Sequence, residues 1–264
     1  HRDLHSFPTR RSSDLEAVSK IKSGDRIGLA IAASEPSGLL TELAKQKDRL
    51  TDVNTWVCLP MRSYEYAVQP EMENHFFVEN WFYGVYDRQV HSQGRMSYIP
   101  NNLHRAAADK LHATGGKLNV YWGTATPPDE RGFMSLSLSL VFEKELIQAA
   151  DMIVLEINEN LPWTLGDTQI HISEVDYVVE NHTPLFELPA ATPSETEQKI
   201  GEYIAELIDD GATLQLGIGG IPNAITHFLK NHKDLGIHTE MFNDGMVDLR
   251  SEERRVGKEC RSRW

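Results

Sequence analysis

The stretch from Thr213 to Asp244, TLQLGIGGIPNAITHFLKNHKDLGIHTEMFND, decides the fold, because it reads as strand, glycine loop, helix and strand in succession. Residues 213–218 form a short apolar run, as in a buried strand, and glycines then interrupt it. Pro222 is typical of the first position of a helix, where its missing N–H costs nothing. Residues 237–241 deliver Glu240 into a polar loop. A carboxylate after one strand, beside a glycine loop after another, is a typical active-site placement in open α/β sheets.

The two ends of the chain do not read as protein sequence under selection. Residues 250–264 back-translate without a break into an oligonucleotide that resembles a sequencing-library adapter, and residues 1–15 correspond to its reverse complement in another frame. A transit peptide and a basic nucleic-acid-binding arm are the alternatives, but neither explains the complementarity. We therefore expect both ends to be adapter-derived, and residues 16–249 to be a native fragment of a longer protein.

The composition narrows the class of protein. Without the two ends the chain has 17 Lys and Arg and 34 Asp and Glu, a net charge of −17, against −13 for the whole sequence. Such acidity argues against a nucleic-acid binder. Cys58 is then the single native cysteine, which indicates a reducing compartment, and it lies in an apolar run typical of a buried position. No apolar run approaches the ~20 residues of a membrane helix. We expect a cytoplasmic protein.

Alternating strand and helix patterns before residue 190 predict an open, mostly parallel α/β sheet. We expect strands at residues 26–32, 51–61, 117–123, 133–140 and 152–157, and helices at residues 16–21, 39–44, 103–112 and 141–150. Residues 133–140, FMSLSLSL, alternate strictly and predict a half-buried strand. Residues 188–194 have the composition of a linker. The predicted domains are therefore residues 16–190 and residues 191–249, the second being the truncated beginning of a similar domain that opens with a helix at 195–208.

The glycine loop GIGGIPNA does not match the common nucleotide-binding motifs. Its last required position for G-x-G-x-x-G is Pro222, and no Gly-Lys-Ser/Thr follows for a P-loop. A helix N-terminus after glycines still offers free N–H groups to a carboxylate or an oxyanion, although a tight turn without a ligand remains the alternative. Glu240 is flanked by Ile237, Met241 and Val247, which favours partial burial over a surface position. No histidine or cysteine spacing predicts a metal site.

Several stretches together resemble the acetyl-CoA hydrolase/transferase family of class I CoA-transferases. The most specific are LGIGGIPNAI and DLGIHTEMFNDGMVDL, and the similarity extends upstream through IKSGDRI, the Glu35–Pro36 pair and INENLPWTLGDTQIHISEVDYVVE. The chain looks most similar to the 4-hydroxybutyrate and butyryl-CoA:acetate CoA-transferase group. The resemblance implies two similar open α/β domains and a homo-oligomer when the protein is full length. It implies acyl-CoA and a short-chain carboxylic acid as partners, and no cofactor, since CoA is a substrate.

The resemblance makes Glu240 the nucleophile of a ping-pong reaction through a glutamyl-CoA thioester. A glutamate is ordinarily ionised at neutral pH, so the attack needs no general base. The resemblance also places the backbone N–H groups of Ile218, Gly219 and Gly220 at the oxyanion or substrate carboxylate, with Gln215 as a further polar group. We expect the chain to be inactive alone. An acyl-CoA hydrolase of the same fold, and a non-catalytic α/β ligand-binding protein, remain as alternatives.

Overall fold

The computed structural model describes residues 10–138, 140–188 and 192–255. The chain divides into two compact units, unit 1 at residues 1–187 and unit 2 at residues 188–264. Each unit is described by itself.

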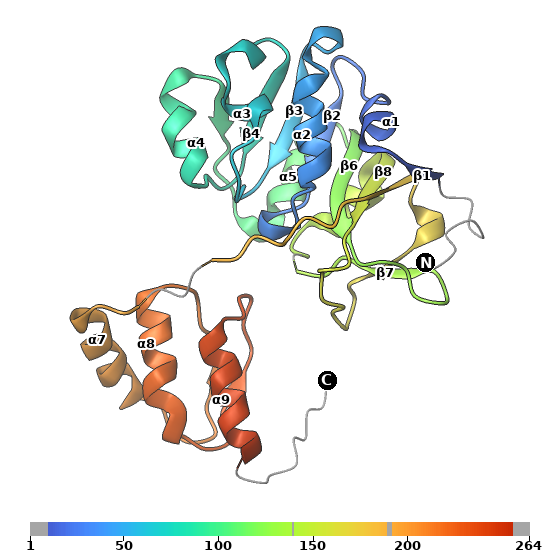
Figure 1. Cartoon of the computed structure of the whole chain (residues 1–264). Coiled ribbons are helices and arrows are strands. Elements are labelled where there is room, and N and C mark those ends of the chain that lie inside the picture. Colours follow the sequence, from blue (N-terminus) through green and yellow to red (C-terminus); the bar gives the residue numbers. More distant parts are fainter. Residues whose placement is uncertain (1–9, 139, 189–191, 256–264) are drawn as a thin grey trace. The chain divides into compact units, whose positions relative to one another are not determined.

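Unit 1 is built on one parallel sheet (Figure 1). Among the described residues it has eight strands, in the order β1-β10-β8-β6-β2-β3-β4-β5. Their bounds are β1 Arg10–Ser12, β2 Arg26–Leu29, β3 Val53–Val57, β4 Phe76–Asn80, β5 Met96–Tyr98, β6 Leu118–Ala125, β8 Ala150–Ile157 and β10 Tyr177–Glu180. Every neighbouring pair is parallel, which confirms the predicted α/β class.

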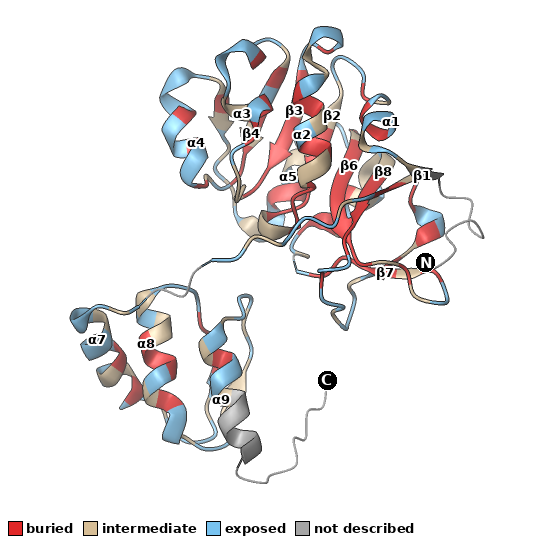
Figure 2. Cartoon of the chain, viewed as in Figure 1, coloured by how far each residue is buried: buried red, intermediate tan, exposed pale blue. Residues whose placement is uncertain are grey.

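The central strands are apolar on both faces, because helices cover both faces of the sheet. Val154 and Val179 pack into one core, and their chain neighbours Leu155 and Val178 pack into the other. Figure 2 shows this burial along β3 and β6, and the second half of β8 is also buried. The uniform apolarity that predicted buried strands therefore reflects a sheet between two cores.

The helices of unit 1 divide between these cores. Their bounds are α1 Asp14–Val18, α2 Ser37–Lys45, α3 Glu65–Val68, α4 Val85–Val90, α5 Ala106–Ala113 and α6 Glu143–Ala149. Buried residues of α1 to α4 join the first core, and those of α5 and α6 join the second. In α2 the inward face is Leu39, Leu40 and Leu43, at the spacing that one side of a helix requires.

Strand order reverses at β2, which lies between β6 and β3. The chain runs from β2 through β3 and β4 to β5, and then returns to β6 on the other side of β2. In open α/β sheets ligands bind outside the carboxyl ends of the strands at such a point. We call the end of the sheet where the carboxyl ends of its strands lie the carboxyl edge.

The prediction of one strand over residues 133–140 is wrong. Strand β7 covers only Phe133–Ser135 and pairs antiparallel with β9, Gln169–His171, outside the main sheet. Ser137 ends the extended run with a positive φ of 63°. Leu136 is buried next to the buried residues of β7, so the observed burial does not alternate with the sequence.

The first strand and the start of α1 lie in residues 10–15, which the sequence predicts to be adapter-derived. Strand β1 pairs with β10 through backbone groups, from Arg10 opposite Tyr177 to Ser12 opposite Val179. Backbone pairing of three residues does not depend on their side chains, so the adapter origin stays a prediction.

Unit 2 contains helices around a short parallel pair of strands. Their bounds are α7 Glu195–Ala205, β11 Thr213–Leu214, α8 Gly220–Phe228, β12 Gly236–Ile237 and α9 Asp244–Arg255. Ser194 caps α7 by accepting a hydrogen bond from the Glu197 N–H. The predicted helix after the glycine loop is present, but it begins at Gly220, so Pro222 occupies the third helical position and not the first.

Helices α7 and α8 meet where both side chains are small. A Cβ placed on Gly201 would lie 2.8 Å from the Ala224 Cβ and 3.0 Å from the Ala224 carbonyl carbon. Contacts this short force the helices apart, because neither neighbouring atom can rotate away. The close approach of α7 and α8 therefore depends on the absence of a side chain at residue 201.

We predict that Gly201→Ala destabilises unit 2 by about 1–2 kcal/mol, since an overpacking cost of roughly 1–3 kcal/mol exceeds the ~1 kcal/mol gain in helix propensity. Amide hydrogen exchange of peptides from α7 and α8 measures the change, and peptides from unit 1 give the internal reference. The matched control is Glu202→Ala, which removes only an exposed ion pair with Lys199. Slower exchange in Gly201→Ala would contradict the packing argument.

Candidate functional site

The carboxyl ends of β11 and β12 bring the glycine loop and Glu240 to the same edge of unit 2. Thr213 pairs with Gly236 and Leu214 with Ile237 in parallel register. The chain that follows β11 is the glycine loop, and the chain that follows β12 contains Glu240. Parallel pairing thus produces the neighbouring positions that the sequence predicted.

Hydrogen bonds on either side of Glu240 hold its loop against the glycine loop. The Thr239 hydroxyl donates to the Leu216 carbonyl at 2.7 Å and accepts from the Leu216 N–H at 3.3 Å. Asn243 Nδ2 donates to the Gly217 carbonyl at 3.0 Å. The structure therefore fixes the backbone of residues 239–243 beside the start of the glycine loop.

The Glu240 side chain is exposed, so the expected partial burial is wrong. Met241 and Val247, on which that expectation depended, are 40% and 47% exposed. The strand is shorter than expected and ends at Ile237. Within unit 2 the Glu240 carboxylate is therefore open to solvent.

Two glycines shape the loop that precedes α8. Gly219 has φ 122° and ψ −176°, a conformation open to glycine but strained for any residue with a Cβ. A Cβ on Gly220 would lie 2.1 Å from Glu197 Oε1, so this position has no room for a side chain unless Glu197 moves. The N–H groups of the first helical turn have no partner within the helix. Gly219 and Gly220 thus let the backbone present those groups at the same edge as Glu240.

The remaining predicted residues lie around this loop. Gln215, Ile218 and Gly219 are exposed and Gly220 is partly buried. Exposed apolar side chains accompany them, with Ile218 50% and Phe242 64% exposed. Sequence reasoning did not name Phe242, although it lies only two residues after the predicted nucleophile.

Unit 1 holds a second group of polar residues, which sequence reasoning missed as a site. Glu35, Glu143 and Glu156 are buried at the carboxyl edge, following β2, beginning α6 and ending β8. Glu156 was detectable in principle, because it interrupts an otherwise apolar strand. Glu35 was noted only as part of the Glu-Pro pair. Burying a carboxylate is costly unless it is hydrogen-bonded, so each has partners.

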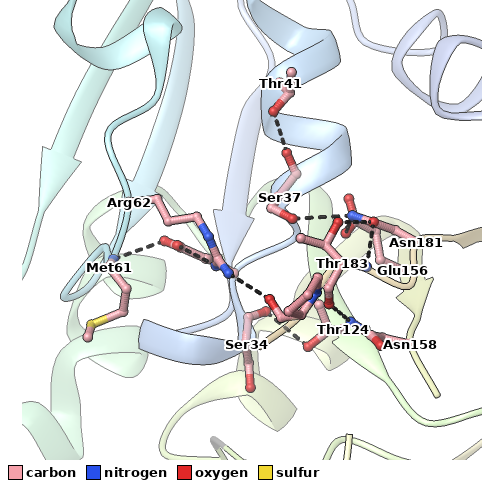
Figure 3. Close-up of polar contacts among 12 residues, drawn as sticks. Ser34, Ser37, Thr41, Met61, Arg62, Thr124, Glu156, Asn158, Asn181 and Thr183 are labelled. Atoms are coloured by element: carbon pink, nitrogen blue, oxygen red, sulfur yellow. Dashed lines mark hydrogen bonds and ion pairs between the residues drawn. The ribbon is translucent and has the colours of Figure 1, made fainter. Parts of the chain in front are cut away.

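Glu156 joins the end of β8 to the start of α2. Its Oε1 accepts a hydrogen bond from the Leu39 N–H at 2.5 Å. Its Oε2 accepts one from Asn181 Nδ2 at 2.8 Å (Figure 3). Burial raises the pKa of Glu156 from 4.5 to about 7, although these hydrogen bonds lower it. A helix N-terminus favours the charged form, but here burial outweighs it.

Glu35 joins the loop after β2 to the loop after β3. Its Oε2 accepts from the Met61 N–H at 3.1 Å, and Arg62 Nη1 lies 3.3 Å from its Oε1 (Figure 3). Burial raises the pKa of Glu35 from 4.5 to about 7 against the lowering effect of Tyr64, Met61 and Arg62. A cavity of about 10 Å³, the room of one water molecule, is lined by Glu35, Cys58 and Tyr64 among others. The expected burial of Cys58 is confirmed.

Glu143 joins the loop after β2 to the segment that leads into α6. Its carboxylate accepts from the N–H groups of Ile31, Val141 and Phe142 at 3.1, 2.6 and 3.0 Å. Burial raises its pKa, and the backbone N–H groups oppose the shift. Glu143 therefore ties the loop after β2 to the start of α6.

Neither a metal site nor a membrane span emerges from the described part of the chain. No group of three or more His, Cys, Asp or Glu side chains there is arranged to hold a metal ion. Among the same residues no helix combines the length and apolarity needed to cross a membrane.

Comparison with known proteins places this architecture. The sequence model of the acetyl-CoA hydrolase/transferase N-terminal domain matches residues 4–187. The chain is 38% identical over 234 residues to the 4-hydroxybutyrate coenzyme A transferase of Clostridium kluyveri, covering 89% of this chain and 54% of that protein. It is 31% identical over 240 residues to the butyryl-CoA:acetate CoA-transferase of Anaerostipes caccae, again covering 54% of that protein. The chain thus spans about half the length of the curated relatives it matches.

Solved structures and two more distant proteins extend the comparison. RipA from Yersinia pestis has a TM-score of 0.86 at 31% identity, over 95% of this chain and 61% of that one. A 4-hydroxybutyrate CoA-transferase from Porphyromonas gingivalis has a TM-score of 0.71 at 30% identity, over 92% and 57%. The acetyl-CoA hydrolase of Neurospora crassa is 25% identical over 60% of this chain and 39% of its own. The glycerol-3-phosphate regulon repressor of Escherichia coli is 38% identical over 76 residues, 28% of this chain and 30% of its own.

The buried carboxylates predict an unusual dependence of stability on pH. A folded-state pKa of about 7 against 4.5 means that the folded chain holds the Glu156 proton more tightly than the unfolded chain. The contribution to the free energy of unfolding is full below pH 4.5 and is lost as the pH rises to about 7.

We predict that raising the pH from 5 to 8 lowers the free energy of unfolding less in Glu156→Gln, which cannot ionise, than in the wild type. The difference between the two changes is up to about 3 kcal/mol. Urea unfolding at the two pH values measures this double difference. Glu145→Gln, at an exposed position of α6, is the matched control and should track the wild type. Parallel curves for Glu156→Gln and the wild type would contradict the raised pKa.

Proposed function

The chain belongs to the acetyl-CoA hydrolase/transferase family, and on that premise we propose that it is part of a CoA-transferase with Glu240 as its nucleophile. The enzyme moves CoA from a short-chain acyl-CoA to a carboxylic acid such as acetate. The observation that carries the proposal is the placement of Glu240, exposed after β12 and held beside the glycine loop through Thr239 and Asn243. The printed activities of the Clostridium kluyveri and Anaerostipes caccae relatives support the same reaction class.

The first half-reaction transfers CoA to the protein. The Glu240 carboxylate attacks the thioester carbonyl, the C–S bond breaks, and a mixed anhydride and CoA thiolate result. The thiolate then attacks the glutamyl carbonyl of the anhydride, which releases the first carboxylate and leaves a glutamyl-CoA thioester. The acyl activation is kept in each intermediate, so no external energy source is needed.

The second half-reaction repeats these steps in reverse with another acid. The acceptor carboxylate attacks the glutamyl thioester and expels CoA thiolate, giving a second anhydride. The thiolate attacks the acceptor carbonyl, forms the new acyl-CoA and returns Glu240 as a carboxylate. Each attack develops negative charge on a carbonyl oxygen, and the N–H groups of Ile218, Gly219 and Gly220 are proposed to stabilise it, with Gln215 as an additional polar group.

The geometry of the loop supports this role. Gly219 and Gly220 allow close approach of the backbone to a ligand, and α8 adds the positive end of its dipole. The exposed apolar side chains of Ile218 and Phe242 suit an acyl chain or the carbon skeleton of CoA. No cofactor takes part in this scheme, in which CoA is a substrate.

We predict that Glu240→Ala in a full-length protein containing this chain lowers CoA exchange between butyryl-CoA and labelled acetate by roughly 10³-fold or more, because it removes the group that carries CoA. Borohydride trapping after incubation with acyl-CoA, followed by mass spectrometry, should place a reduced adduct at residue 240. Glu195→Ala, at an exposed position of α7, is the control and should keep both signals. An adduct in Glu240→Ala, or full activity, would exclude the proposed nucleophile. The 264-residue chain assayed alone should show no exchange.

Two alternatives are separated by the same preparation. In a hydrolase of this family water would take the place of the acceptor acid, and CoA release would proceed without acetate. The similarity to the Neurospora crassa acetyl-CoA hydrolase is the reason for this test. A non-catalytic ligand-binding protein would give no adduct at all. The short similarity to a regulon repressor is the reason for considering this alternative. A transferase releases CoA slowly without acetate and exchanges it quickly when acetate is present.

A further inference from the structure

The chain that leaves β10 is bound along the carboxyl edge of unit 1, and we call residues 181–186 the exit segment. Asn181 Nδ2 donates to Glu156 at the end of β8, and Asn158 Nδ2 donates to the Thr183 carbonyl at 2.8 Å. Figure 3 shows both contacts, with Glu156 and Asn158 at the end of β8. The exit segment thus begins at β10 and first crosses the end of β8.

Arg62 holds the far part of the exit segment. Its Nη2 donates to the Pro184 carbonyl at 3.0 Å, and its guanidinium lies 5.7 Å from the centre of the Phe186 ring. Arg62 follows β3, and the order of strands is β10-β8-β6-β2-β3. The exit segment is therefore held by residues that follow β8 and β3, two strands on opposite sides of the point where the strand order reverses.

The same guanidinium is paired with Glu35. Arg62 Nη1 lies 3.3 Å from Glu35 Oε1, and the carboxylate is 4% exposed while the arginine side chain is 28% exposed. One side chain thus connects the loop after β2, the loop after β3 and the exit segment. An arginine suits this position because its fork directs donors to two acceptors at once.

We propose that Arg62 is a positioning residue, and that Glu35 and Arg62 form a clasp that fastens the exit segment across the carboxyl edge while Glu35 is ionised. The clasp determines where the chain leaves unit 1 on its way to unit 2. It concerns only contacts within unit 1, so it stands whether or not Glu240 is the nucleophile.

The groups that face Glu35 leave its own proton as the variable near neutral pH. Arg62 is a permanent cation. Burial raises the pKa of Tyr64 and of Tyr66, so both phenols stay neutral. The Cys58 thiol lines the same small cavity. The pKa of Glu35 is about 7, raised by burial against the lowering effect of its hydrogen-bond partners and of the Arg62 charge. Acid therefore neutralises Glu35 and weakens its hold on Arg62.

The clasp and the free energy of unfolding should depend on pH in opposite directions. Burial of Glu35 makes the folded chain more stable as the pH falls from 7 to 5, as for Glu156. The clasp has the opposite dependence, because only the carboxylate form attracts Arg62. Acid should thus loosen the exit segment while the unit as a whole becomes harder to unfold.

The test attaches a nitroxide spin label at Glu187→Cys, an exposed position directly after the exit segment, in the 264-residue chain with Cys260→Ser. Cys58 is buried and escapes labelling. We expect a restricted line shape at pH 8.5 that shifts toward nanosecond mobility as the pH falls through about 7. Arg62→Ala and Glu35→Gln should be mobile throughout this range.

Two further variants separate the clasp from simple loss of folding. Arg95→Ala is the matched control: Arg95 also binds backbone carbonyls, at Ala67 and Gln69, but not the exit segment, so its label should behave as in the wild type. Arg62→Lys keeps the charge without the fork and should be more mobile than the wild type at pH 8.5. A line shape in Arg62→Ala or Glu35→Gln that is unchanged from the wild type would overturn the proposal. So would a label in Arg95→Ala that is as mobile as the label in Arg62→Ala.

Discussion

Parallel pairing of short apolar strands is the constraint on which the rest of this structure depends. It sends the chain out of every strand at the same edge of a sheet, so loops distant in sequence meet there. In unit 1 the loops after β2, β3 and β8 are joined at that edge through Glu35, Glu143 and Glu156. In unit 2 the same rule places the glycine loop after β11 beside the loop after β12. The chemistry differs between the units, but the placement has one cause.

Much of the fold could be predicted, because the central strands of unit 1 are buried on both faces and read as continuous apolar runs. The helix after the glycine loop and the neighbouring position of Glu240 were also predictable from local patterns. The failure at residues 133–140 has a physical reason. Alternation predicts one exposed face, but β7 pairs with β9 outside the main sheet, and Ser137 turns the chain. Local periodicity cannot show which sheet a strand joins.

The candidate site in unit 2 could be located from the sequence, but its burial could not. Met241 and Val247 looked like the flank of a buried strand, whereas β12 ends at Ile237 and both side chains are exposed. The buried carboxylates of unit 1 were missed for a related reason. Glu156 is satisfied by the Leu39 N–H, 117 residues away, and no pattern within either segment reveals that partner. Long-range hydrogen bonds decide whether a carboxylate is tolerable in a core.

The backbone of Gly219 has a consequence at the level of the gene. Each single-nucleotide change in a glycine codon that alters the amino acid gives either a residue with a Cβ or a stop. At φ 122° a Cβ is strained. Residue 219 therefore has no conservative neighbour in the genetic code, and its codon can drift only at the third base. Gly217 is not among the glycines with positive φ, and an added Cβ there would meet no atom within 4 Å, so it is free of this conformational restriction and the two codons of one loop should diverge at different rates.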